Sequence, residues 1–295
     1  MKNCSLMLKA PLLLLIVICL EISVSGQTLI NQVIDSKTGL SIPYVNIGIV
    51  GKNTGTVSDQ DGKFQLSISE ALDNDTLKFS MVSYVTQVFS VADIRQSGLP
   101  QFVAMDQREI QLQEVIVSSE SATQIKLGLN KKYCYPIPLY KGASSNLTFP
   151  QKGSQHEIGT RFSNTNPIYI DSLQINFAYA QTDTVAFRIN IYVIENESII
   201  NILEKPIYVE WSKEEALDFP MINLTKYQIE VDTDFLVAIE NYKNMPDGST
   251  KILANFKSKG RVYPTYYRNS SQSKWIKLQT KKLKDIGMSI MVFGN

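Results

Sequence analysis

The sequence has few residues of the kinds that build disulfides and metal centres. Its 295 residues include three cysteines and a single histidine, His156. Cys4 and Cys19 lie before residue 27, in a segment interpreted below as an export signal, so only Cys134 remains and no intramolecular disulfide is expected. Zinc peptidases need several histidines with a glutamate, and no HExxH or related pattern is present. We therefore predict no metal site and no cofactor, and interpret Cys134 as a buried structural thiol.

The sequence also lacks an excess of charge of one sign. Lys and Arg number 29 against 28 Asp and Glu. A balanced chain has no overall electrostatic attraction to nucleic acid or to an anionic membrane. A glycine-rich phosphate loop and βαβ alternation are also absent, so we predict neither a nucleic-acid partner nor a nucleotide site.

The one long apolar run stands near the start of the sequence. Lys2 and Lys9 precede the apolar segment Leu12–Leu20, and small residues follow up to Gly26. As a helix this segment would span roughly 14 Å, about half of the hydrocarbon thickness. The pattern predicts a signal peptide over residues 1–26, with Cys19 inside the apolar run rather than at a lipidation site. We expect a chain exported to the periplasm, outer membrane or cell surface, with no transmembrane segment after cleavage.

After residue 26 the apolar residues recur with period two, which is typical of β-strands with one buried face. Gly, Asn and Asp separate the alternating segments. Seven short strands in such a stretch predict one small β-sandwich over residues 27–117. The expected strands are Leu29–Ile34, Pro43–Val50, Lys63–Ile68, Thr76–Ser80, Thr86–Val91, Gln101–Ala104 and Gln113–Val117.

The segment Ser58–Gly62 lies between two of the alternating runs and predicts a hairpin, because Gly62 allows a positive φ. The same segment superficially resembles a calcium loop. The first ligand position, however, holds Val57 and the twelfth holds Ile68, where a bidentate carboxylate is needed. Calcium is therefore not predicted.

Residues 118–151 interrupt the alternation and are interpreted as a linker, polar at its start. Residues 152–295 return to alternating segments and predict a larger antiparallel sandwich or jelly roll, so the fold class is all-β. One helical turn is expected, over Lys213–Leu217. The expected strands are His156–Phe162, Ile168–Tyr179, Thr184–Val193, Pro206–Trp211, Tyr227–Val231, Phe235–Glu240, Lys251–Phe256, Val262–Tyr267, Lys274–Lys277 and Gly287–Phe293.

A multi-part motif runs through the first predicted domain. It reads Val33-Ile34-Asp35-x-x-Thr38-Gly39-x-x-Ile42-Pro43-Tyr44-Val45-Asn46-Ile47, then Gly51-x-x-x-Gly55-Thr56-x-Ser58-Asp59-x-x-Gly62-x-Phe64. With Leu77-x-Phe79 and Glu114-Val115-Ile116-Val117, this pattern resembles the carboxypeptidase-regulatory-like domains of Bacteroidetes envelope proteins. Asn31 and Ser83 depart from it, each standing where a glycine is usual.

The resemblance implies a transthyretin-like sandwich of seven strands. Such domains occur beside carboxypeptidase catalytic domains and at the front of TonB-dependent outer-membrane transporters, so the resemblance does not fix an activity. Residues 152–295 are similar, more loosely, to the β-rich region that follows this domain in exported Bacteroidetes proteins. The residues that carry this second similarity are Phe187-x-Ile189-x-Ile191-Tyr192 and Leu236-Val237-x-Ile239-Glu240.

No catalytic residues are predicted. His156 is interpreted as a surface or strand-edge histidine, and serine nucleophiles lack the Gly-x-Ser-x-Gly context. Paired carboxylates are the remaining route to glycoside hydrolysis, but the nearest candidates lie in turns or diverge on a helical turn. These candidates are Glu195 with Glu197, and Glu214 and Glu215 with Asp218.

Aromatic residues give the stronger hint of binding. Exposed rings stack on sugars or anchor protein partners, although sandwich cores also contain Trp and Tyr. The candidate ligand surface is Trp211, Tyr266, Tyr267 and Trp275. Adjacent Tyr266 and Tyr267 are expected on opposite faces of a strand, one buried and one accessible. Asp-Ser/Thr-apolar triplets also make Thr76, Ser172 and Thr184 candidates for O-glycosylation.

These features favour an exported, non-catalytic binding or adhesion module of the cell envelope, with a protein or glycan ligand. The alternative is an accessory component of a TonB-dependent uptake system, which the resemblance of residues 27–117 suggests. An unrecognised glycan-active enzyme is the third hypothesis.

Overall fold

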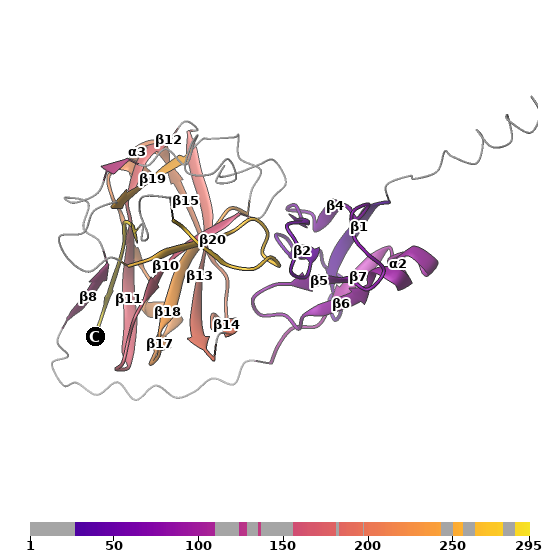
Figure 1. The fold of residues 1–295 in the computed structure, drawn as a ribbon, viewed down its shortest axis with the longest axis horizontal. Coiled ribbons are helices and arrows are strands. Elements are labelled where there is room, and N and C mark those ends of the chain that lie inside the picture. The colour runs from indigo at the N-terminus through magenta and orange to yellow at the C-terminus, as the bar shows by residue number, and fades with distance from the viewer. Residues whose placement is uncertain are drawn as a thin grey trace, which may run out of the picture.

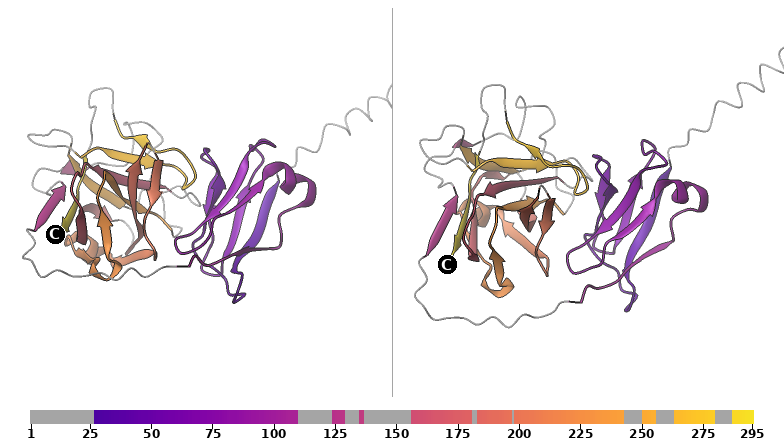
Figure 2. Two further views of the ribbon diagram at one scale, coloured as in Figure 1. Left: turned by 90° about the horizontal axis from the view of Figure 1, so that it is seen from below. Right: turned by 60° about the horizontal axis from the view of Figure 1, so that its bottom comes forward.

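The computed structural model describes residues 27–109, 124–128, 135–136, 156–180, 183–196, 198–242, 250–255, 263–279 and 287–295. Strands dominate these residues, with two short α-helices and one 3-10 helix among them. The predicted all-β fold class is confirmed. Figures 1 and 2 show the strands gathered in two bodies that lie side by side, the first indigo to magenta and the second mainly rose to yellow.

The first domain is a sandwich of two sheets. A three-stranded sheet has the order β4-β1-β7, in which β1 and β7 are parallel, and a four-stranded antiparallel sheet has the order β3-β2-β5-β6. Val33, Ile47, Leu77 and Phe79 are fully buried in the core between them. The strands are β1 Thr28–Asp35, β2 Asn46–Ile49, β3 Gly55–Val57, β4 Lys63–Ser67, β5 Thr76–Ser80, β6 Gln87–Ser90 and β7 Phe102–Met105.

The predicted hairpin at Ser58–Gly62 is wrong. Strand β3 pairs with β2 and strand β4 pairs with β1, so the turn carries the chain from one sheet to the other. Gly62 does take a positive φ of 74°, as expected for the turn. The carboxylate of Asp59 accepts hydrogen bonds from the backbone N–H groups of Asp61 and Lys63, which closes the turn.

A helix that the alternation did not predict follows β6. Helix α2 spans Val91–Ser97 and buries Val91 and Ile94, which are spaced to lie on one helical face. A helix of about two turns with two buried apolar residues is too short to give a periodic signal in the sequence. The expected strand Gln113–Val117 lies outside the described residues.

The second domain is built from three antiparallel sheets around one core. The largest has seven strands in the order β14-β13-β18-β10-β20-β21, with β15 also pairing with β13. Its strands are β10 Glu157–Phe162, β13 Thr184–Glu195, β14 Ser198–Asn201, β15 Ile207–Ser212, β18 Phe235–Glu240, β20 Thr265–Arg268 and β21 Ile276–Lys277. Helix α3, Lys213–Leu217, confirms the expected helical turn, and the Ser212 hydroxyl and Glu215 carboxylate form its capping box.

The other two sheets complete the sandwich. The five-stranded sheet contains β8 Ile125–Gly128, β11 Ile168–Ile175, β16 Met221–Asn223, β17 Ile229–Val231 and β23 Ile290–Gly294, and the 3-10 helix η2 spans Thr225–Tyr227 beside it. The four-stranded sheet contains β9 Tyr135–Pro136, β12 Phe177–Ala180, β19 Thr250–Asn255 and β22 Gly287–Met288. The predicted strand Ile168–Tyr179 is divided at Asn176, whose buried side chain bonds Ser289.

Part of the predicted linker 118–151 is ordered on the second domain. Strand β8 pairs with β23 and strand β9 pairs with β19, so residues 125–128 and 135–136 belong to the sheets of this domain. Cys134 lies outside the described residues.

Candidate functional site: a cationic cavity between the domains

The seven-stranded sheet carries a row of four charged side chains across its outer face. The strand registers place Arg188 of β13 opposite Glu240 of β18, Glu240 opposite Glu157 of β10, and Glu157 opposite Arg268 of β20. Residues directly opposite each other in a sheet share a face. The row therefore runs cation, anion, anion, cation across neighbouring strands.

Each buried carboxylate of the row is held by one arginine. Arg188 Nε and Nη2 donate to Glu240 Oε2 at 3.1 and 2.8 Å, and Arg268 Nε donates to Glu157 Oε2 at 2.7 Å. The Asn190 amide links the two pairs, because its Nδ2 donates to Glu157 Oε1 at 2.8 Å and to Glu240 Oε2 at 2.7 Å. A half-satisfied buried charge is costly. The row pairs its charges within one network, and among the described residues only Glu240 Oε1 of its carboxylate oxygens has no hydrogen-bond partner.

Burial shifts the titration of the row. Removal from water raises the pKa of Glu157 above its ordinary value of 4.5, and neighbouring Glu240 adds to the rise while Arg268 opposes it. Tyr192 donates to Glu157 Oε1 at 2.7 Å and accepts from Arg268 Nη2 at 2.8 Å. Burial also raises the pKa of the Tyr192 phenol, so that hydroxyl stays a hydrogen-bond donor at neutral pH.

Arg188 reaches beyond its own domain. Its Nη1 donates to the carbonyl oxygen of Tyr44 at 3.0 Å, and its Nη2 donates to Asn46 Oδ1 at 2.7 Å, both in the first domain. Tyr44 has a φ of 60°, in the left-handed region that favours glycine. Its ring packs against Tyr208 and Tyr242 at centroid distances of 5.6 and 4.7 Å. The buried guanidinium is thus a direct link between the two domains.

Two further contacts join the domains. The loop after β20 contacts β5 and the turn after β2, since Gln272 Nε2 donates to Ser80 Oγ at 2.8 Å and the Gly51 N–H donates to the Gln272 carbonyl at 2.8 Å. The second contact is from Ser83, one of the two departures from the family motif, which keeps a positive φ of 76°. Its hydroxyl donates to the carbonyl of Glu204. The serine therefore keeps the turn geometry expected of glycine and adds an interdomain hydrogen bond.

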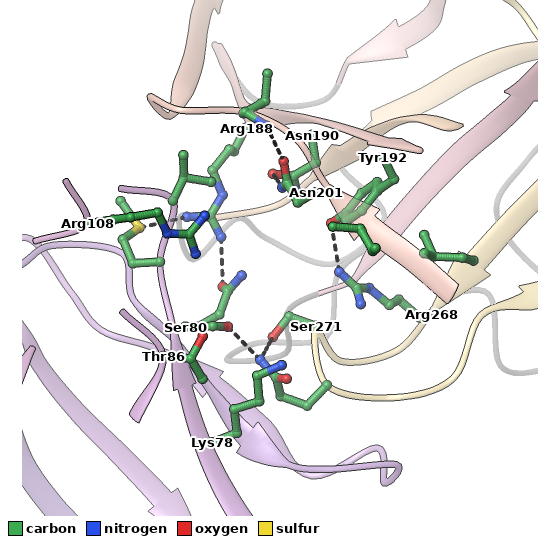
Figure 3. Close-up of a pocket in the computed structure, with 17 residues that line it drawn as sticks. Lys78, Ser80, Thr86, Arg108, Arg188, Asn190, Tyr192, Asn201, Arg268 and Ser271 are labelled. Atoms are coloured by element: carbon green, nitrogen blue, oxygen red, sulfur yellow. Dashed lines mark hydrogen bonds between the residues drawn. The ribbon is translucent and has the colours of Figure 1, made fainter. Parts of the chain in front are cut away.

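A cavity of about 370 Å³ lies between these contacts and is lined from both domains. Figure 3 shows Arg108, Lys78, Arg188 and Arg268 around it, from different sides. Among the described residues that line the cavity there is no aspartate or glutamate. The first domain also contributes Asn46, Ser80, Met81, Val82 and Thr86, and the second contributes Asn190, Tyr192, Ile199, Ile200, Asn201, Leu203, Ser271 and Gln272.

The four cations of the cavity are not equivalent. Arg188 and Arg268 are paired with Glu240 and Glu157 behind the wall. Lys78 and Arg108 have no carboxylate partner within the part of the chain that the structure describes. Burial and the nearby Arg268 charge lower the pKa of Lys78, as expected for a half-buried cation that lacks an anion.

The predicted aromatic surface is divided between two environments. Trp211 packs in the main core at ring-centroid distances of 5.4 Å from Phe187 and 6.3 Å from Phe177. Trp275 lies on the outer face instead, with the Arg268 guanidinium 4.6 Å from its ring centroid. The four candidates therefore do not form one surface, and only Trp275 and Tyr266 lie near the charged row.

Tyr266 and Tyr267 do point to opposite faces of β20. Tyr267 packs against the main core, and Tyr266 packs with Trp275 against the outer-face cluster of Tyr192, Leu236 and Ala238. Both rings are half-buried, so the expectation that one is buried and the other accessible is wrong. The reason is that the outer face of this sheet is itself covered.

The remaining candidates lie away from the cavity. Thr76 begins β5 and is half-buried, Ser172 is half-buried within β11, and Thr184 is exposed at the start of β13. Of the carboxylates considered for hydrolysis, Glu197 lies outside the described residues; the others, Glu195, Glu214, Glu215 and Asp218, are exposed.

His156 is buried rather than at the surface, because it immediately precedes β10 in the middle of the largest sheet.

The sequence reasoning missed the residues that build the site. Arg188 and Asn190 occupy the alternate positions of a strand whose apolar residues were noted, and Glu240 ends another such strand. A charged residue that ends an otherwise apolar strand is a signal of a buried partner, because unpaired buried charges are rare. Lys78 and Arg108 carry no such signal, since their meeting with the second domain depends on how the domains pack.

Comparison with known proteins finds a family model and a relative that each match part of the chain. Residues 31–117 match the family model of the CarboxypepD_reg-like domain. TonB-dependent receptor P3 of Formosa agariphila is 33% identical over 97 residues, which cover 33% of this chain and 9% of that receptor. The chain thus matches a small part of the receptor's length.

Among solved structures, that of infectious bursal disease virus, Gx strain, aligns over 91% of this chain and 64% of the viral chain at 9% identity. Its TM-score of 0.23 is too low to carry an argument.

No helix within the described ranges is long and apolar enough to cross a membrane.

Proposed function

We propose that this chain, whose residues 31–117 are a CarboxypepD_reg-like domain, is a non-catalytic binding protein of the cell envelope. Its ligand occupies the cationic cavity between the domains. The observation that carries this proposal is the cavity itself, which both domains line and which the buried charged row stiffens from behind. Pockets at domain interfaces are preferred sites for small ligands.

A binding role fits the cavity better than hydrolysis does. The two nearest carboxylates, Glu157 and Glu240, are fully buried, and three of their four oxygens accept hydrogen bonds from Arg268, Arg188 and Asn190. A general acid or base must reach the proton that it transfers. These carboxylates orient the arginines of the wall and are not placed to contact a ligand.

The test is a binding screen with a variant that fills the cavity. Thr86 lines the cavity and is exposed, so Thr86→Trp occupies the space without disturbing the core. Val88→Trp is the matched control, because Val88 is 57% exposed in the same strand region and is not among the residues that line the cavity. Residues 27–295 are screened against a glycan array and a library of small metabolites by thermal shift.

We expect compounds that bind the native chain and Val88→Trp but no longer bind Thr86→Trp. A ligand that binds both variants equally well places the binding surface elsewhere and contradicts the proposal.

A second candidate function is an accessory role in a TonB-type uptake system, and the similarity to a TonB-dependent receptor favours it. The first domain would then act as a docking module for an outer-membrane transporter. Immobilised residues 27–295 should enrich such a transporter from envelope extracts, identified by mass spectrometry. Enrichment no greater than on resin carrying an unrelated β-sandwich would end this alternative.

A further inference from the structure

We propose that the interdomain cavity takes a small ligand with two anionic groups, such as carboxylates, sulfates or phosphates. This inference rests on the proposed function and adds the chemical class of the ligand. It follows from the charges of the cavity wall, from the hydrogen bonds already made there, and from its size.

The charges of the wall leave an excess of two positive units. Four cationic side chains line the cavity, and the two buried glutamates behind it neutralise Arg188 and Arg268. Lys78 and Arg108 remain without an anion among the described residues. A ligand with two negative charges would neutralise Lys78 and Arg108. In a partly desolvated site these cations otherwise repel the other cations of the wall strongly.

The neutral polar groups of the wall are largely engaged with one another. Asn201 Nδ2 donates to Asn190 Oδ1 at 3.0 Å, and Asn201 Oδ1 accepts from the Leu203 N–H at 3.0 Å. Ser80 Oγ accepts from Gln272, and Asn190 Nδ2 donates to both glutamates. These bonds leave few free neutral donors and acceptors for the hydroxyls of an uncharged sugar.

Lys78 and Arg108 instead offer free donors, whereas Arg188 already donates to Glu240, Tyr44, Asn46 and Met81. Ammonium and guanidinium groups donate hydrogen bonds and accept none, so they match acceptor-rich oxyanions. In Figure 3, Lys78 extends upward from the first domain, Arg108 lies beside Arg188 at the left, and Arg268 lies at the right of the space between them. A ligand with one oxyanion at each end would contact both free cations of the first domain and would face the second-domain wall, which includes Asn201 and Arg268.

The cavity volume sets the scale of the ligand. About 370 Å³ lies near the lower end of the volumes of small-molecule pockets, roughly 300–1,000 Å³. A single small acid or an acidic monosaccharide fits this space, and a polymer does not.

The experiment measures binding of defined probes to residues 27–295 by calorimetry at low ionic strength and neutral pH. The probes are succinate, sulfate and hydrogen phosphate as dianions, acetate and glucuronate as monoanions, and glucose as the neutral case. Succinate distinguishes a dicarboxylate ligand from the inorganic oxyanions. We expect at least one dianion to bind about tenfold more tightly than the monoanions, with glucose inactive, because each additional hydrogen bond to a charged group strengthens binding by about tenfold or more.

Variants locate the interaction. Lys78→Met and Arg108→Met should each weaken dianion binding about tenfold or more, for the same reason. Lys78→Arg should retain most of the affinity. The matched control is Lys37→Met, since Lys37 is exposed in the same domain and does not line the cavity.

The outcomes separate the two proposals. A neutral ligand that Thr86→Trp abolishes, with no preference for anions, would overturn the ligand class and leave the proposed function standing. Dianion binding that is unchanged in Lys78→Met and Arg108→Met would overturn the site assignment for anions. Failure of every probe and of every library compound to bind would overturn both proposals.

Discussion

The two faces of the seven-stranded sheet are both buried, but by different chemistry. The inner face of β13 presents Phe187, Ile189 and Ile191 to the main core. The outer face of the same strand presents Arg188 and Asn190 to the charged row and the first domain. The inner face resembles any sandwich core, whereas the outer face carries a polar network that the first domain covers.

The comparison shows what alternation means in a two-domain protein. Alternation with period two in the sequence assigns side chains to the two faces of a strand, but it does not show that the polar face is exposed to solvent. In β13 every described position from Val185 to Val193 is buried, the polar ones included. The polar face of a strand thus becomes a candidate site when another domain lies against it.

The largest expected effect is on the outer face. Arg188→Met leaves Glu240 buried without its cation, and breaking a buried pair in this way costs about 3–5 kcal/mol of unfolding free energy. Urea denaturation of residues 27–295 measures the cost. On the inner face, Ile189→Val removes one methyl group and should cost about 1 kcal/mol.

A double variant sharpens this comparison. Arg188→Met with Glu240→Met replaces both charges by apolar groups, and should recover a large part of the stability that the single variant loses. If Arg188→Met alone lowers the free energy of unfolding no more than Ile189→Val does, the charged row contributes no more to stability than an ordinary core position.

The two tryptophans test the same contrast. Trp211→Ala opens a cavity beside Phe177 and Phe187 and should cost about 3 kcal/mol. Trp275→Ala removes a ring that lies against the Arg268 guanidinium, a contact of about 0.5–2 kcal/mol. Chemical denaturation should rank the inner-face variant as the less stable. The reverse order would mean that the outer-face cluster holds the sheet together.

The pH dependence of stability tests the charge state of the row. Burial raises the pKa of Glu157, so the folded chain binds this proton more tightly than the unfolded chain. That contribution is present in full below the ordinary value of 4.5 and is lost as pH rises through the folded pKa. The stability of the native chain relative to Glu157→Gln should therefore be greatest at acidic pH and decline as pH rises. A difference that grows with pH would show that Arg268 dominates instead.

In the first domain a buried carboxylate has a lowered pKa instead of a raised one, and its expected effect on stability is the smallest of those considered. The backbone N–H of Thr38, with Gln107 and Lys37, lowers the pKa of Asp35 from 3.8 to about 2, against the opposing effect of burial. This contribution is present above the unfolded value and is lost as pH falls through the folded one. The advantage of the native chain over Asp35→Asn should fade between about pH 4 and 2. An advantage that persists to pH 2 would place the stabilising contacts elsewhere.

Much of the fold could be predicted from the sequence. Alternation located most strands, and the motif from Val33 to Phe64 identified the first domain. Helix α2 was missed because about two turns with two buried apolar residues give no clear period. The turn at Asp59 was misread because a crossing between sheets uses the same residues as a hairpin. Local chemistry fixes a turn, but not the partners of the strands beside it.

The site could not be predicted in the same way. Lys78, Arg108, Arg188 and Arg268 lie far apart in the sequence, and the packing of two domains brings them together. Aromatic content indicated the region of Trp275 but not its role beside Arg268. Only one part of the site could have been predicted from the sequence: Glu240, a charged residue at the end of an apolar strand.

The central claim is that ligand binding engages both domains at the cavity. Hydrogen–deuterium exchange of residues 27–295, with and without a ligand found in the screen, measures this directly. The account predicts slower exchange in β5, Thr76–Ser80, of the first domain together with β14, Ser198–Asn201, and the 270–273 loop of the second. Protection confined to one domain, or to strands that do not border the cavity, would contradict it.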